Sequence, residues 1–255
     1  MARFEHDGVS LYYEVHGDGP WLVFAHGAGG NALSWWQQVP TFARRFRCVV
    51  YDQRGWGRSV CKDTPSPQAF ASDLAALLDH LGVEHTALVG QSMGGWTTLG
   101  CTILRPAKVT HLVLTGTIAG LTDDAMMRDL SKFHAEHGGA GFDPHKALAP
   151  DFPTREPALT LLYDQISALN PLVGQEFLAA LLSLRYADHS QKLGAKVLFI
   201  AGAQDQLFPL DIVRAAHAKV PQAQLAILPV AGHSGYFECA GEFNQRLMTF
   251  LASEG

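Results

Sequence analysis

The segment Gly90-Gln91-Ser92-Met93-Gly94 places a serine between an apolar strand pattern and a helix pattern. Glycines at positions 90 and 94 leave room for a sharp strand-to-helix turn, because a Cβ atom there would obstruct neighbouring backbone. Such a turn lifts the Ser92 side chain above a sheet and directs the N–H groups of the helix at developing negative charge. The segment therefore predicts a nucleophilic serine for acyl transfer, although a plain glycine-rich turn would have the same composition.

A serine is a weak nucleophile unless a base accepts its proton, and an acid must orient that base. In open α/β sheets these groups lie on loops that follow the carboxyl ends of strands. Asp205 follows the strand pattern of residues 197–201, and His233 follows that of residues 224–228. We predict a catalytic triad with Ser92 as nucleophile, Asp205 as acid and His233 as base. Taken singly, the aspartate could cap a helix and the histidine could bond backbone, so their common position at strand ends carries the prediction.

The segment His26-Gly27-Ala28-Gly29-Gly30 directly follows another apolar strand pattern. Acyl transfer passes through an oxyanion that needs two preorganised N–H donors, one from the residue after the nucleophile and one from a loop of this kind. We predict these donors to be the backbone N–H groups of Met93 and Ala28. The alternative, a dinucleotide-binding turn, is disfavoured because G-x-G-x-x-G does not occur in this loop. His26 is expected to be a structural hydrogen-bonding residue.

Strand and helix patterns alternate through the first 119 residues and again after residue 193. Strands are expected at 9–16, 21–25, 47–51, 86–89 and 109–114, and helices at 32–46, 66–81 and 93–104. Between residues 120 and 193 we find helix patterns and no convincing strand. The sequence predicts an α/β fold with a mostly parallel sheet, a core domain of residues 1–119 and 194–255, and a helical cap insertion of residues 120–193.

Composition limits the possible partners of the 255-residue chain. The formal net charge of −5 and the absence of a basic run argue against nucleic acid. No apolar run approaches the 18 or so residues of a membrane span, and the N-terminus lacks the pattern of a secretory signal. Four cysteines without C-x-x-C spacing are typical of reduced thiols in a cytoplasmic protein. No cofactor or metal site is expected, and a homo-oligomer is left open.

The motifs together resemble those of the α/β-hydrolase superfamily. HGAGG, the loop DQRGWGRS at residues 52–59, GQSMGG and the AGH of residues 231–233 match that family in order and spacing. The chain is most similar to small bacterial esterases, enol-lactonases, carbon–carbon-bond hydrolases and cofactor-free perhydrolases. The resemblance implies an eight-stranded sheet with one antiparallel strand and a lid over the site. It also implies that Asp52, Arg54 and Ser59 are structural residues, and the serine nucleophile argues against the branches that attack with a carboxylate.

We therefore expect a serine hydrolase that cleaves carboxylic esters or lactones through an acyl-enzyme on Ser92. The same residues could cleave a carbon–carbon bond of a vinylogous diketone or use hydrogen peroxide, and a ligand receptor without turnover is a further alternative. A short-chain dehydrogenase is excluded because no tyrosine has a lysine four residues later. Apolar residues near the catalytic loops or in the cap are expected to line the substrate pocket: Trp35, Trp36, Phe133, Phe142, Tyr163 and Leu207.

Overall fold

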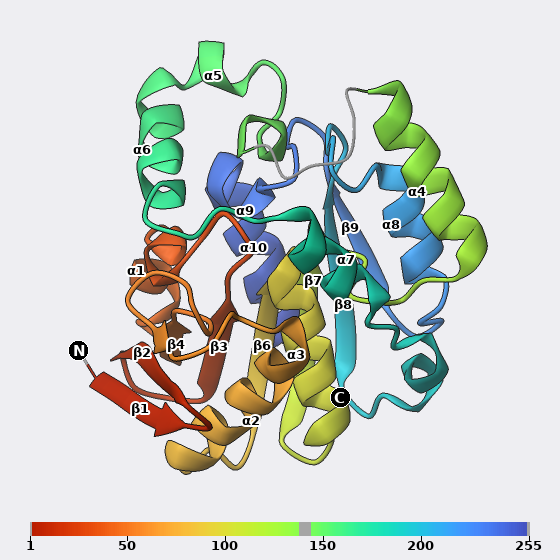
Figure 1. Ribbon diagram of the computed structural model, residues 1–255. Coiled ribbons are helices and arrows are strands. Elements are labelled where there is room, and N and C mark those ends of the chain that lie inside the picture. The colour runs from red at the N-terminus through yellow and green to blue at the C-terminus, as the bar shows by residue number, and fades with distance from the viewer. Residues whose placement is uncertain (1, 138–143, 254–255) are drawn as a thin grey trace.

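The computed structural model describes residues 2–137 and 144–253. Its centre is one sheet (Figure 1), in which the strand order is β1-β2-β4-β3-β6-β7-β8-β9 and the short β5 pairs with β2. The strands are β1 (Ala2–His6), β2 (Val9–His16), β3 (Trp21–Ala25), β4 (Arg47–Tyr51), β5 (Val60–Cys61), β6 (Thr86–Gln91), β7 (Val109–Thr115), β8 (Lys196–Gly202) and β9 (Gln224–Leu228).

The six strands from β4 to β9 along this order run parallel, whereas β2 is antiparallel to β1, β4 and β5. The carboxyl ends of the parallel strands therefore meet at one edge of the sheet. The expected mostly parallel α/β sheet is confirmed, with β5 as an additional short strand. The turn at residues 17–20 joins β2 to β3 without forming a hairpin, because β4 lies between these two strands. The hairpin of this region is instead β1–β2, whose first strand we did not predict.

The parallel strands read as continuous apolar runs because helices cover both faces of the sheet. In β3, Val23 points to one face and packs with residues of α2 (Phe70–His80), α3 (Met93–Leu104) and α8 (Leu210–His217). Phe24 points to the other face and packs with residues of α1 (Val39–Phe42) and α10 (Ala240–Leu251). Successive residues of a strand alternate between the faces, so each strand contributes to both cores.

The helix expected over residues 32–46 is interrupted. The structure has a 3₁₀ turn, η1 (Ala32–Trp35), followed by the separate short helix α1. Pro40 stands in the first turn of α1, where a missing N–H costs nothing, but it could not continue a helix from residue 32. The side chain of Asn31 caps η1 by accepting from the Leu33 N–H at 2.9 Å.

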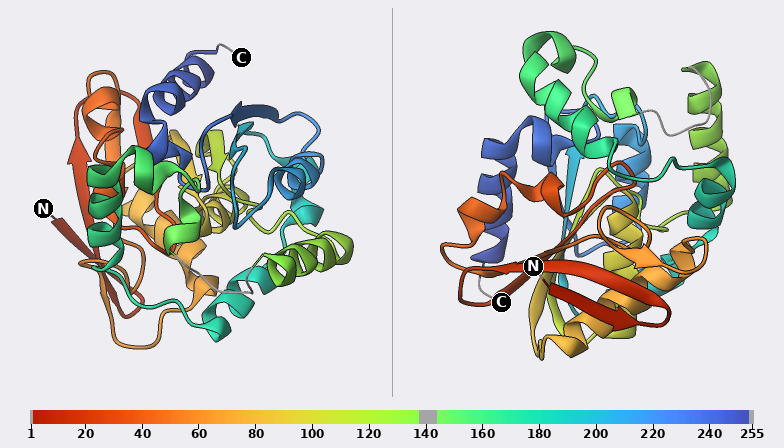
Figure 2. Two further views of the ribbon diagram at one scale, coloured as in Figure 1. Left: turned by 90° about the horizontal axis from the view of Figure 1, so that it is seen from above. Right: turned by 60° about the vertical axis from the view of Figure 1, so that its left-hand side comes forward.

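Residues 120–193, called the insertion below, form helices and turns, and no strand occurs in their described part. Figure 1 has α5 and α6 at the upper left and α4 at the upper right, and from above they lie on two sides of the sheet (Figure 2). The elements are α4 (Asp124–Glu136), η3 (Pro144–Ala147), α5 (Phe152–Arg155), α6 (Pro157–Ser167), α7 (Gln175–Ser183) and η4 (Ala187–Lys192). Outside the insertion, η2 (Pro67–Ala69) precedes α2 and α9 (Gly235–Glu238) precedes α10. No helix of the described residues combines the length and apolarity needed to cross a bilayer.

Candidate active site

Ser92 occupies a strained turn between β6 and α3. Its backbone has φ 50° and ψ −119°, in the positive-φ region that residues other than glycine rarely adopt. Three hydrogen bonds hold this conformation. The Ser92 N–H donates to the Thr115 carbonyl at 3.0 Å, and the Ser92 carbonyl accepts from the Gly95 N–H and the Thr117 hydroxyl, both at 2.8 Å. The turn keeps the serine side chain partly exposed at the carboxyl edge of the sheet.

The glycines of the turn are required by close backbone contacts. A Cβ atom at Gly90 would collide with the Gly94 carbonyl, and one at Gly94 would collide with the Ala25 carbonyl. The start of α3 therefore packs directly against the end of β3. This contact brings the loop after β3 alongside Ser92: a Cβ atom at Gly27 would lie 2.9 Å from the Cβ atom of Ser92.

His233 and Asp205 form a buried hydrogen-bonded pair. The distance between His233 Nδ1 and Asp205 Oδ2 is 2.8 Å, and the two side chains are 2% and 1% exposed. The other carboxylate oxygen accepts from the N–H groups of Leu207 and Phe208 at 2.8 and 2.9 Å, so the carboxylate cannot rotate freely. An ionised Asp205 requires the proton on Nδ1, which leaves a lone pair on Nε2. Within the described part of the chain no group hydrogen-bonds His233 Nε2.

Two backbone N–H groups beside Ser92 are available for an oxyanion. Met93 is the first residue of α3, so its N–H has no acceptor within the helix. The Ala28 carbonyl accepts from the Trp56 indole at 2.7 Å, and the Gly27 carbonyl accepts from the Gly30 N–H at 3.0 Å. These bonds fix the peptide planes of the loop. Neither the Ala28 N–H nor the Met93 N–H donates to any protein group in the described residues.

The loop after β3, residues 26–30, is called the oxyanion loop below for its predicted role. His26 supports this loop, and both of its ring nitrogens are hydrogen-bonded. Its Nδ1 donates to the Gly27 carbonyl at 2.7 Å, and its Nε2 accepts from the Gln53 N–H at 2.9 Å. Complete burial lowers the pKa of His26, which keeps the ring neutral and suits this pattern of one donor and one acceptor. The contacts agree with the structural role expected for His26.

The loop after β4 supports the same region. Asp52 is fully buried and accepts from the Ala32 N–H at 2.7 Å and the Arg58 N–H at 2.6 Å. Arg54 donates to both carboxylate oxygens of Asp73 at 2.8 and 2.6 Å, and this pairing raises the pKa of Arg54. The sequence did not single out Arg58 or Asp73. A charged residue in a loop or on a helix does not show by its type or spacing which partner it will bind in the folded protein.

A cavity of about 340 Å³ opens above Ser92. It is bounded by the core and by helices α4 and α7 of the insertion. Its lining is mainly aliphatic and aromatic: Ala28, Ser92, Met93, Trp96, Leu130, His134, Gln175, Leu178, Ala179, Leu181, Leu182, Leu207, Phe208 and His233. The predicted nucleophile, base and oxyanion donors therefore share one cavity, and the predicted pocket residue Leu207 lines it too. A small ligand with an apolar group fits such a lining.

Four other predicted pocket residues lie elsewhere. Trp35 is fully buried in the core, with its ring 4.9 Å from that of Phe24. Trp36 is 42% exposed on the outer surface, beside Phe237. Proximity in sequence to the loop after β3 was misleading here, because neither indole lines the cavity above Ser92.

The two other predicted residues that do not line this cavity belong to the insertion. The ring of Phe133 stacks on His137, with 4.2 Å between the centroids, on a half-buried part of α4. Tyr163 is buried against Phe237, and its hydroxyl hydrogen-bonds the Ser234 hydroxyl at 2.8 Å. Phe142 lies outside the described residues.

Most of the cavity residues that the sequence analysis missed come from two amphipathic helices, and Trp96 of α3 and Phe208 after β8 were missed as well. Leu130 and His134 are one turn apart on α4, and Leu178 and Leu182 are one turn apart on α7. Helical spacing predicts an apolar face but not its orientation toward Ser92, which depends on how the insertion packs. His134 donates through Nε2 to the Leu207 carbonyl at 2.9 Å and so joins α4 to the loop of Asp205.

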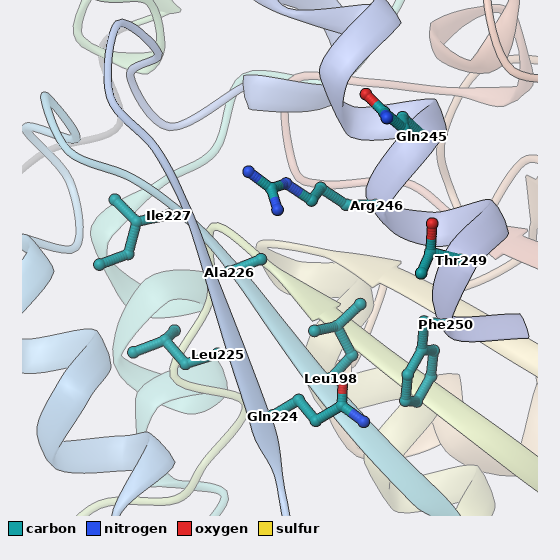
Figure 3. Close-up of a pocket in the computed structure, with 9 residues that line it drawn as sticks. All are labelled: Leu198, Gln224, Leu225, Ala226, Ile227, Gln245, Arg246, Thr249 and Phe250. Carbon is teal, nitrogen blue, oxygen red and sulfur yellow. The ribbon is translucent and has the colours of Figure 1, made fainter. Parts of the chain in front are cut away.

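A second hollow lies at the edge of the sheet between β9 and α10 (Figure 3). Of its described lining residues only Arg246 is ionisable, and this side chain is paired with Glu242 at 3.0 Å. Its described lining contains no serine, cysteine or histidine, whereas Ser92 and His233 both line the cavity above Ser92, so that cavity is the better candidate. Nor do the described residues bring three or more His, Cys, Asp or Glu side chains together as a metal would require.

Comparison with known protein families agrees with this geometry. Residues 20–240 match the family model for the alpha/beta hydrolase fold. The chain belongs to the α/β-hydrolase family. The expected resemblance is confirmed over most of the core, and the protein is a hydrolase of this fold.

Individual relatives have several described activities. The chain is 29% identical over 259 residues to a putative carbamate hydrolase, RutD, of Caulobacter sp. strain K31, with 96% of each chain covered. Among solved structures, a carboxylesterase of Nitrososphaera gargenis superposes with a TM-score of 0.82 at 24% identity, covering 98% of both chains. Est816, described as an N-acyl homoserine lactone degrading enzyme, gives 0.80 at 24% identity, covering 98% of this chain and 100% of that one.

Proposed function

We propose that this α/β-hydrolase cleaves carboxylic esters or lactones through an acyl-enzyme on Ser92. The observation that carries the proposal is the buried pair of His233 and Asp205 in the wall of the cavity that also contains Ser92. The pair leaves His233 Nε2 as an acceptor without a protein partner in the described residues. A serine in a strained turn next to such a base has the environment of an activated nucleophile.

In the proposed reaction His233 Nε2 takes the proton of the Ser92 hydroxyl as Oγ attacks the carbonyl carbon of the substrate. The resulting oxyanion accepts hydrogen bonds from the N–H groups of Ala28 and Met93, each worth about 3–4 kcal/mol of transition-state stabilisation. Collapse of the intermediate breaks the bond to the alkoxy oxygen, which receives the proton from Nε2. A water molecule then gives a proton to Nε2, attacks the acyl-enzyme and releases the acid.

Asp205 keeps the imidazole in the required tautomer and stabilises the imidazolium that forms twice in each cycle. The apolar lining of the cavity favours an uncharged substrate with a hydrocarbon group. We also propose that the insertion acts as a cap, since α4 and α7 supply much of that lining. A cytoplasmic location is consistent with four cysteines that form no disulfide.

The test is hydrolysis of a panel of p-nitrophenyl esters and lactones by the unaltered protein and by Ser92→Ala. We expect the substitution to lower kcat/KM by about 10⁴-fold or more while the circular dichroism spectrum is unchanged. Ser72→Ala is the matched control, because Ser72 is an exposed serine on α2 and should have no effect. Undiminished hydrolysis by Ser92→Ala would refute the proposal.

The same panel tests the alternatives. Carbon–carbon cleavage of a vinylogous diketone or peroxide-dependent halogenation that exceeds every ester and lactone rate would replace the proposed reaction while keeping the nucleophile. Binding of esters without turnover by the unaltered protein would favour a receptor.

A further inference from the structure

A short segment of the insertion lies directly on the loops that hold Asp205 and His233. We call residues 147–149 the strap; all three are fully buried. A Cβ atom at Gly232 would lie 2.5 Å from the nitrogen of Ala149, so the two backbones are in direct contact. The Ser234 N–H donates to the Ala147 carbonyl at 2.9 Å, which joins the strap to the residue after His233.

The strap also contacts the loop of the acid. The Gln206 side chain, next to Asp205, donates to the Leu148 carbonyl at 3.4 Å. Because the strap bonds to both loops, it links two segments that come from different strands of the sheet. The strap therefore supports the loops of both residues that form the 2.8 Å contact, His233 and Asp205.

Glu238 forms hydrogen bonds to both the strap and the loop of His233. Its Oε2 accepts from the Ala149 N–H at 2.8 Å, and its Oε1 accepts from the Gly232 N–H at 3.0 Å. One carboxylate thus binds the strap and the residue immediately before His233. A carboxylate can accept both bonds at once, whereas an amide or a protonated carboxyl group has only one strong acceptor oxygen.

We infer that Glu238 is a positioning residue for the reaction proposed above: its carboxylate clamps the loop of His233 to the strap and so sets the orientation of the imidazole toward Asp205 and Ser92. The inference rests on the proposed function. A displacement of the base by even 1 Å is enough to slow proton transfer by up to about a hundredfold. The clamp also makes the position of the base depend on the docking of the insertion.

The carboxylate is kept despite an electrostatic cost. The pKa of Glu238 is raised to about 7: burial is the main cause, the bonds to Ala149 and Gly232 oppose it, and the charge of Asp205 adds to it. A neutral residue at position 238 would avoid this cost, so the presence of a carboxylate there suits a role that needs two acceptor oxygens. Five ionisable groups surround Glu238: Asp205 after β8, His233 in its loop, Tyr163 of α6, Tyr236 of α9, and Cys239. The charges of Asp151, Arg155 and Glu242 in turn act on the pKa of Cys239.

The first experiment compares Glu238→Gln with the unaltered protein on the best ester of the panel. Glutamine has nearly the same shape but places an NH₂ group against one of the two N–H donors. We expect kcat to fall roughly ten- to hundredfold with KM changed less than about threefold, because positioning acts on the chemical step. Glu242→Gln is the control, since this carboxylate pairs with Arg246 at the surface and should leave kcat unchanged.

The second readout is the pH profile of both proteins between about pH 5.5 and 8.5. Protonation of Glu238 removes the clamp from the unaltered protein but cannot affect the glutamine variant, so the ratio of their kcat values should fall towards one at low pH. A ratio that is constant with pH, or equal kcat values at pH 8.5, would overturn the inference.

A third measurement does not depend on catalysis. Hydrogen exchange followed by NMR should show the amides of Ala149 and Gly232 exchanging at least about tenfold faster in Glu238→Gln at pH 8, and unchanged protection would overturn the clamp. If the unaltered protein hydrolyses nothing, the proposed function fails while this exchange result still reports on the clamp. If Ser92→Ala is inactive and Glu238→Gln is fully active, only the positioning role fails.

Discussion

At the scale of single residues, the site depends on backbone conformation as much as on side-chain chemistry. Ser92 has a positive φ that costs on the order of 1–3 kcal/mol, and the packing of α3 against β3 maintains it. Asp205 is held by two backbone N–H groups, so it can orient His233 without rotating. Both features fix the geometry of the site before any substrate binds, and the strained turn does so at a cost in stability.

Glu238 gives a prediction of pH-dependent stability with a definite sign. Its pKa is about 7 in the folded protein against an ordinary value of 4.5, so the folded state binds the proton more tightly than the unfolded chain. Stability should therefore decrease as pH rises from about 4.5 to 7 and change no further above that. The difference between these two pKa values corresponds to a decrease of at most about 3 kcal/mol in the free energy of unfolding.

Urea denaturation at pH 5 and pH 8 gives the free energy of unfolding of the unaltered protein and of Glu238→Gln. The contributions of all other titrating groups cancel in the difference between the two proteins. We expect the variant to gain stability relative to the unaltered protein by up to about 3 kcal/mol on going from pH 5 to pH 8. A difference that is the same at both pH values would contradict the assigned ionisation.

At the scale of elements, the site is built where the carboxyl ends of β3, β6, β8 and β9 converge. Each strand is followed by one loop of the candidate site, and no loop contains more than one member of the proposed triad. Side chains of the insertion bond to individual loops of this set. Asn170, which follows α6, donates to the Gly29 carbonyl at 3.1 Å and accepts from the Asn31 side chain at 3.2 Å. It therefore ties the oxyanion loop to the insertion.

We predict that Asn170→Ala lowers kcat by about three- to tenfold on the preferred ester, because the loop that carries the Ala28 N–H loses one of its supports. Steady-state kinetics measures the change. Asn244→Ala on α10 is the matched control, since it removes a comparable bond to the Gln37 carbonyl at 3.3 Å, at a site whose residues do not line the cavity. An Asn170 variant as active as the Asn244 variant would show that the tie does not affect the oxyanion loop.

The sequence was most informative where local rules and tertiary structure agree. Buried parallel strands such as β3 and β4 are continuous apolar runs, and the glycines around Ser92 mark a turn that few other residue types could form. The order Ser92, Asp205, His233 followed from the rule that functional loops lie at strand ends. These features depend on the residues next to them in sequence, so they could be predicted without knowing the fold in three dimensions.

The sequence was least informative where distant segments decide the outcome. The helix expected over residues 32–46 overlooked the effect of Pro40, and β1 has only an alternating pattern that is easily taken for a loop. Trp35 was assigned to the pocket from its position beside the oxyanion loop, but the fold buries it in the core. Leu182 was missed because the orientation of α7 is determined by packing against other elements rather than by its own spacing.

At the scale of the whole molecule, the cavity lies between the core and the insertion. Ser92, Trp96 and Phe208 come from the core, and Leu130 and Leu182 come from the insertion. With a lining this apolar, we expect transfer of hydrocarbon from water to be the main source of binding energy. In the proposed reaction the catalytic groups determine the bond that is attacked, and the space between the two parts determines the size of the group that is accepted.

This arrangement predicts a dependence on acyl length. For p-nitrophenyl esters, kcat/KM should increase by up to about fourfold for each added methylene until the cavity of about 340 Å³ is full, and then decrease. Leu182→Trp should shift the optimum to a shorter acyl group while leaving the acetyl ester within about threefold of its original rate. A steady decline from acetyl onwards, in both proteins, would show that the cavity does not receive the acyl group.

The central claim is that Ser92 is the nucleophile, and covalent capture tests it most directly. After treatment with a fluorophosphonate, peptide mass spectrometry should find one adduct, on the peptide containing Ser92, with loss of ester hydrolysis in proportion to labelling. Ser92→Ala should not be labelled. An adduct on a different residue, or hydrolysis that continues after complete labelling of Ser92, would contradict the account.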